Sequence, residues 1–273
     1  PTRRSSDLML PHKNLIPDIN LTPYSIWLAT VVVSGISYLS YLLKRYVFHE
    51  SGTLVSGIIG GLYSSTATIS VLARKSRKAS EQEATEYVAA MLLAVSMMFL
   101  RFMILILIFS REIFLSIYPY LLIMSVVSAI VGWFVHSRQK LPKDTSVESE
   151  EDDSSNPLEF KVALIFAVLF VVFTVLTHYT LVYAGTSGLN LLSFVSGFSD
   201  ITPFILNLLQ NTGSVAVLII TACSMQAIVS NILVNMFYAL FFAGKRSKLR
   251  PWILGGFGAV IACNLVLLLF FYL

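Results

Sequence analysis

The stretch "GGLYSSTATIS", residues 60–70, decides how this chain folds. It lies inside an apolar segment bounded by Val55 and Val71. Gly60 and Gly61 come first, and we expect them to weaken a continuous helix. Hydroxyl residues follow them: Ser64, Ser65, Thr66, Thr68 and Ser70. Broken backbone at membrane depth persists only where protein or a wet cavity satisfies its polar groups. The stretch therefore predicts an interrupted membrane segment rather than a continuous helix that faces lipid.

The composition around this stretch is that of an integral membrane protein. The chain has 273 residues, of which 56% are hydrophobic and 12% charged, and its mean hydropathy is +0.78. Soluble domains are about one-quarter charged. The net charge of +4 comes from basic clusters at the ends of apolar runs, which indicates membrane flanks and no nucleic-acid partner. Cys223 and Cys263 lie inside apolar runs, so neither a disulfide framework nor a zinc site is expected.

Eight apolar segments have lengths near the ~20 residues that cross a bilayer. They cover residues 25–43, 53–73, 87–109, 117–135, 160–184, 189–209, 214–243 and 251–273. We expect a first membrane repeat over 9–135, a charged linker over 136–159 and a second repeat over 160–273. Residues 1–8, "PTRRSSDL", read either as a translated sequencing adapter, with native sequence from Met9 and a part missing upstream, or as an ordinary polar start.

The second segment of each half carries a similar interruption. "LVSGIIGGLYSSTATISVLA" in the first half matches "SFVSGFSDITPFILNLLQ" in the second, since both have Val-Ser-Gly, then polar residues, then an apolar run. Gly197 aligns with either Gly57 or Gly61. We prefer the alignment with Gly61, because it matches Ser64 with Asp200 and so places a polar residue opposite a polar residue. Duplicated halves with an interrupted segment at matching positions are typical of transporters.

The distribution of Lys and Arg favours re-entrant segments. Arg3, Arg4 and Arg101 are left out of the count. If all eight segments span, the two sides collect 9 and 7 Lys and Arg residues; if segments two and six enter and leave on one face, the split becomes 14 against 2. Making segment six alone re-entrant gives 13 against 3, so the charges do not decide whether segment two is re-entrant. The similarity of the two halves argues that both segments are. We therefore expect an all-α polytopic membrane protein of two inverted repeats, each with three transmembrane helices and one re-entrant or broken segment. The positive-inside rule places the linker in the cytoplasm and the chain in the inner (plasma) membrane.

Arg101 and Asp200 are the titratable residues that matter most at membrane depth. A charge there costs at least ~2.5–3.5 kcal/mol, so each needs a partner or water. We expect them to pair or to share one wet site; either a static structural ion pair or a cargo site fits. Asp200 is the single candidate metal ligand. The predicted ion-binding residues are Ser64, Ser65, Thr66, Thr68, Arg101, Asp200, Thr202 and Asn231.

Asn231 lies on a polar face of the seventh segment together with Asn235. Such amides either ligand an ion or join helices by hydrogen bonds, and the second role is the commoner one in membranes. Motifs of enzymes, such as HExxH, GxSxG and a phosphate loop, are missing from the sequence, so we expect no enzyme and no cofactor.

The ordered motifs "GLYSSTATISVLARKS", "MFLRF", "SGFSDI" and "SNILVNMFYALFFAG" resemble the membrane domain called domain of unknown function 4010. In bacteria and archaea this domain is often found behind an MgtC/SapB-type domain. The resemblance implies a link to magnesium or other divalent cations, and an MgtC-like domain upstream. The chain departs from the family pattern at Thr202 and Pro203, where a second acid is usual, and at Asn235, where a Lys is usual.

These observations predict a transporter or channel for a small inorganic ion, with a divalent cation such as magnesium as the first choice. Hydroxyl, amide and carboxylate oxygens are the ligands of hard cations. Helix N-termini together with Arg101 would suit an anion instead. The alternative class is a membrane regulator that moves no ion and binds a partner through its helices. The sequence is also compatible with assembly into a homo-oligomer.

Overall fold

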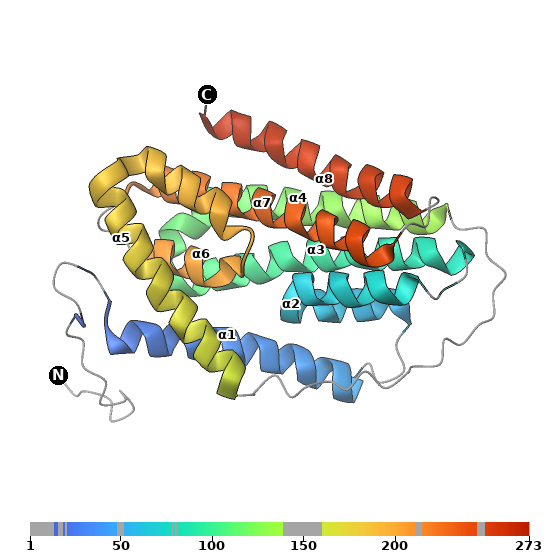
Figure 1. Cartoon of the computed structure of the whole chain (residues 1–273), viewed down its shortest axis with the longest axis horizontal. Helices are drawn as coiled ribbons and strands as arrows, with labels where there is room; N and C mark the ends of the chain where they lie inside the picture. The colour runs from blue at the N-terminus through green and yellow to red at the C-terminus, as the bar shows by residue number, and fades with distance from the viewer. Residues whose placement is uncertain are drawn as a thin grey trace.

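The protein is a bundle of α-helices, seen in a computed structural model that describes residues 14–15, 19, 21–47, 52–77, 79, 81–138, 160–210, 215–244 and 249–272 (Figure 1). The helices are α1 (Pro23–Leu42), α2 (Thr53–Ser76), α3 (Glu81–Phe109), α4 (Arg111–Ser137), α5 (Phe160–Ser196), α6 (Ile201–Gln210), α7 (Val217–Ala243) and α8 (Leu249–Tyr272), and a short π-helical turn, Leu43–Val47, continues α1. The expectation of an all-α polytopic membrane protein is confirmed. Residues 1–8 and most of the linker lie outside the described residues, so the proposed domain division stays a prediction.

Helix α2 folds back on itself at Ser64. The backbone there has φ −158° and ψ 106°, which is extended rather than helical. A Cβ on Gly60 would collide with the side chain of Thr68, whereas residues eight apart in one straight helix lie about 12 Å apart. The two halves therefore lie side by side, as Figure 1 shows. We call α2 hairpin 1 and the residues around Ser64 its tip.

The contacts of hairpin 1 with α3 establish the same reversal independently. Gly57 packs on the backbone of Ala90, and Gly61 packs on that of Ala94. Both residue numbers rise together, so the first half of α2 runs parallel to α3. Helices that follow one another across a membrane are antiparallel, and a parallel pair requires the intervening chain to turn round. Segment two is thus re-entrant in this structure.

The two glycines correct one detail of the sequence interpretation. Gly60 and Gly61 were expected to weaken the helix, yet both are helical, and the break falls at Ser64. Their missing side chains serve close packing instead. Gly60 accommodates the returning half of the hairpin, and Gly61 accommodates α3.

The second half of the chain repeats this arrangement. Gly185 has φ +60°, a conformation that favours glycine, and it separates the spanning part of α5 from residues 186–196. The turn at residues 197–200 then reverses the chain into α6 (Figure 1). We call residues 186–210 hairpin 2 and the turn its tip. The expected segment 189–209 is therefore two short helices.

Each repeat thus contains a spanning helix, a hairpin and two more spanning helices. Within the part of the chain that the structure describes, seven helices are long and apolar enough to cross a membrane by length and composition. Of these, α2 is folded into hairpin 1, and each of its halves, roughly 17 Å long, reaches about half-way through the hydrocarbon. The hairpins enter from opposite ends of the bundle, and their tips face one another in Figure 1.

Helices α3 and α7, the third elements of the two repeats, form the centre of the bundle. Their spans are the most buried of the candidate spans, and both hairpins pack against both helices. Large apolar side chains cover the outside of α4, α5 and α8, among them Ile130, Trp133, Val182 and Phe270. Such a surface is suited to lipid rather than to water.

Candidate functional site

Ser64 shapes the tip of hairpin 1. Its Oγ accepts a hydrogen bond from the N–H of Ala67 at 3.3 Å, which makes Ser64 the N-cap of the returning half. In an unbroken helix, that N–H would bind the carbonyl of Tyr63. The break frees the Tyr63 carbonyl, and it accepts a hydrogen bond from Arg101 Nη1 at 2.7 Å instead.

Asp200 has the equivalent place at the tip of hairpin 2. Its Oδ1 accepts a hydrogen bond from the N–H of Thr202 at 2.9 Å, so Asp200 caps α6 as Ser64 caps the returning half of α2. Ser64 and Asp200 correspond in the register that aligns Gly61 with Gly197. The Asp200 side chain is exposed at the protein surface. A carboxylate in hydrocarbon is expensive, which argues that its exposed side meets water.

Arg101 of α3 joins the two tips. Its side chain is only 8% exposed. Nη1 donates to Tyr63 in hairpin 1, and Nη2 donates to Thr202 Oγ1 in hairpin 2 at 3.4 Å. Nε is buried and has no hydrogen-bond partner among the described residues. One guanidinium group therefore connects the elements that enter the bundle from opposite ends.

The expected pairing of Arg101 with Asp200 takes a looser form. The carboxylate lies within range of electrostatic attraction to the guanidinium. The two described side chains form no ion pair, because the guanidinium binds Tyr63 and Thr202 while Asp200 caps α6. They share one site without direct contact.

Asn231 holds the tip of hairpin 2 from α7. Its Nδ2 donates to the carbonyl of Gly197 at 3.3 Å, and its Oδ1 accepts from Asn235 Nδ2 at 3.1 Å. Gly197 has no room for a side chain, because a Cβ there would collide with Ser230. This geometry agrees with the helix-joining role of such amides.

Among the described residues, the guanidinium of Arg101 forms its hydrogen bonds with Tyr63 and Thr202 and not with the remaining predicted site residues. Thr68 packs on Gly60 inside hairpin 1. Ser65 is buried, and Thr66 is half-buried, with its carbonyl bound by Ser70 Oγ at 2.8 Å. The structure thus gathers Ser64, Arg101, Asp200, Thr202 and Asn231 at the tips, while Thr68 stabilises the hairpin itself.

Sequence reasoning missed the Tyr63 carbonyl. A backbone acceptor leaves no mark in the residue types, although its place directly before the hydroxyl run was a usable signal. The Gly197 carbonyl was missed for the same reason. Both become acceptors because a reversal removes their partners within the helix.

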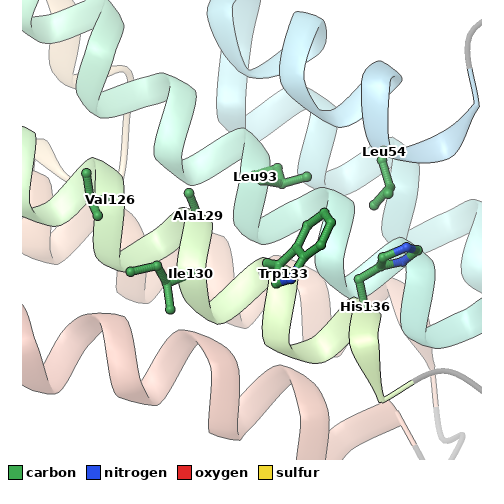
Figure 2. Close-up of a pocket in the computed structure, with 8 residues that line it drawn as sticks. Leu54, Leu93, Val126, Ala129, Ile130, Trp133 and His136 are labelled. Atoms are coloured by element: carbon green, nitrogen blue, oxygen red, sulfur yellow. The ribbon is translucent and has the colours of Figure 1, made fainter.

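The cavity in Figure 2 is a separate feature on the outer surface. It has a volume of about 380 Å³, and its lining from α2, α3 and α4 is almost entirely apolar. Trp133 borders it and is 71% exposed. A shallow apolar hollow on the lipid-facing side does not suit a small ion, so we place the candidate site at the hairpin tips.

Comparison with known proteins finds one family of unknown function and an uncharacterized relative. The model of the family "Domain of unknown function (DUF4010)" matches residues 31–243, which include both hairpins. An uncharacterized protein of Aquifex aeolicus (strain VF5) is 25% identical over 224 residues, covering 81% of this chain and 96% of the relative. No solved structure matches the chain significantly.

Proposed function

For this chain, which belongs to the DUF4010 family, we propose a role as a secondary transporter that binds a small ion between the tips of its two hairpins. The observation that carries the proposal is the meeting of two re-entrant hairpins, from opposite ends of the bundle, at the side chain of Arg101. Inverted repeats whose broken segments meet near the midplane are the architecture in which transporters bind their cargo.

The two repeats supply the symmetry that alternating access needs. Each hairpin belongs to one repeat and enters from one end of the bundle. A cargo between them is released to either side according to which hairpin moves away from it. Arg101 contacts both tips, so a bound ion beside it would sense either opening.

The basic residues support one orientation in the membrane. Arg45, at the end of α1, and a cluster at the end of hairpin 1, Arg74, Lys75 and Arg77, lie at the end of the bundle where α4 finishes with Arg138 and α8 begins near Arg250. Arg111 lies at the opposite end, where α4 begins. On the positive-inside rule we propose that the first end is cytoplasmic, and the plasma membrane stays the expected location.

A divalent cation as the cargo has less support from the described residues. The described residues include no group of three or more His, Cys, Asp or Glu side chains that could hold a metal ion. Asp200, the one candidate metal ligand, lies beside the positive charge of Arg101, which disfavours a second cation. Magnesium as the cargo and an upstream MgtC-like domain stay predictions, as does the absence of enzymatic activity.

Flux measurements on the purified protein in lipid vesicles test the proposal. Ion-selective dyes inside the vesicles report the uptake of each ion under an imposed gradient. We expect uptake of at least one small ion by the native protein and a large loss in Arg101→Gln. The exposed Arg111→Gln variant is the matched control and should transport as the native protein does. A native protein that is folded, inserted and inactive toward every ion would refute transport and favour the regulator class.

A further inference from the structure

We propose that the ion at the hairpin tips is an anion, an oxyanion or a carboxylate, whose oxygens accept hydrogen bonds from Arg101. This inference rests on the proposed function, because it assigns the class of cargo at the same site. The first evidence is that, among the described residues, the tips leave a hydrogen-bond donor without an acceptor.

The tips have more donors than acceptors. A guanidinium group carries five N–H donors and no acceptor. Arg101 donates two hydrogen bonds among the described residues, at 2.7 Å to the Tyr63 carbonyl and at 3.4 Å to Thr202 Oγ1, and the second is long. Its Nε is buried without a partner among the described residues. Nε is therefore a free donor that suits a hydrogen-bond acceptor.

The charge around Arg101 also favours an anion. Each tip contains the end of one half-helix and the start of the next, so their dipoles partly offset one another. The sign of the local field is then set by side chains. Arg101 is 8% exposed, whereas Asp200 is exposed to its surroundings and screened by them. The buried charge is the positive one.

Asp200 acts as a competitor in this arrangement. Its carboxylate attracts the guanidinium without contacting it, and it stays tied to the N–H of Thr202. An arriving anion must overcome repulsion from Asp200, which weakens binding. Transport requires cargo that binds firmly enough to enter and weakly enough to leave. Asp200 then tunes affinity as a positioning residue, whereas Arg101 holds the cargo.

The planar fork of Arg101 narrows the class of anion. Guanidinium binds carboxylate, phosphate and similar oxyanions through two parallel hydrogen bonds, which a spherical halide cannot accept in the same way. The hydroxyl of Thr202 lies beside the guanidinium group. Ser64, which also carries a hydroxyl, directly follows Tyr63, whose carbonyl the guanidinium binds. Inorganic oxyanions and organic carboxylates both present oxygens that accept such a pair of hydrogen bonds.

Calorimetric titration of the full chain in detergent tests the inference apart from flux. The probes are the sodium salts of nitrate, sulfate, phosphate, acetate and succinate, with chloride and magnesium chloride as contrasts. We expect binding of at least one oxyanion or carboxylate and weaker binding of chloride. Arg101→Gln should weaken it about 10- to 100-fold, the effect of losing a hydrogen bond to a charged group, and Arg101→Lys should restore only part. Arg111→Gln should leave it unchanged.

Asp200→Asn distinguishes an anion from a cation as the cargo, and this test does not depend on the folding of an Arg101 variant. If the cargo is an anion, removing the negative charge should tighten binding by about tenfold. If Asp200 ligands a cation, the same change should abolish magnesium binding, and that result overturns the inference. Cation flux without anion binding also overturns it and leaves transport intact. Anion binding without any flux supports the site and refutes the transport proposal.

Discussion

Replacing Gly61 with alanine should separate hairpin 1 from α3. The new Cβ would lie 2.6 Å from both the Cα and the carbonyl oxygen of Ala94. Those atoms belong to the backbone of a buried helix and cannot rotate away, so hairpin 1 must move by roughly 1 Å to restore van der Waals contact. Overpacking of this kind costs about 1–3 kcal/mol. Alanine returns about 0.5–1 kcal/mol of helix propensity, which leaves a net loss between about 0 and 2.5 kcal/mol.

Thermal unfolding in detergent, followed by intrinsic fluorescence, measures this loss. For a chain of this size, each kcal/mol of lost stability lowers the midpoint by roughly 2–4 °C. Gly35→Ala is the matched control, because Gly35 is also inside a helix and has no atom within 4 Å of its added Cβ. It should not lower the midpoint. Equal midpoints for the two variants would show that the close contact between Gly61 and Ala94 is wrong.

Three further predictions address the topology, a helix cap and a buried polar pair. In a background without Cys223 and Cys263, Gly52→Cys and Arg77→Cys should react with a membrane-impermeant thiol reagent from the same side, and Ala216→Cys from the other; labelling of the first two from opposite sides would exclude a re-entrant hairpin 1. Ser64→Ala should cost about 0.5–2 kcal/mol in unfolding, whereas an unchanged stability would mean that the cap on Ala67 is dispensable. Tyr120→Phe should cost about 1–3 kcal/mol because it deprives the buried Asn264 of its hydroxyl partner. Adding Asn264→Leu should recover part of that loss, and strict additivity would contradict the pairing.

The sequence was informative about the hairpins because interruption leaves compositional traces. Hydroxyl residues and Asp200 inside apolar runs indicated broken segments, and the match between the halves aligned Ser64 with Asp200. The split of basic residues favoured re-entry, since hairpins return their flanking charges to the face they came from. These signals are local or additive along the chain, so they survive without knowledge of the packing.

The residues that contact one another across the site were harder to predict. Elimination brought Arg101 and Asp200 to one place, but it could not show that Arg101 binds the Tyr63 carbonyl and Thr202 rather than the acid. A freed carbonyl exists only once the break is placed at a particular residue. The glycines were misread for a related reason, because close packing and helix breaking use the same residue type.

The placement of Arg101 and Asp200 on different repeats has an electrical consequence. Arg101 is fixed to a spanning helix of the first repeat, and Asp200 to the tip of a hairpin of the second. If one repeat shifts against the other along the membrane normal, these opposite charges separate and a gating current results. Moving one unit charge through the whole of a 100 mV potential is worth about 2.3 kcal/mol. Membrane voltage would thus bias which hairpin opens, even before any cargo has bound.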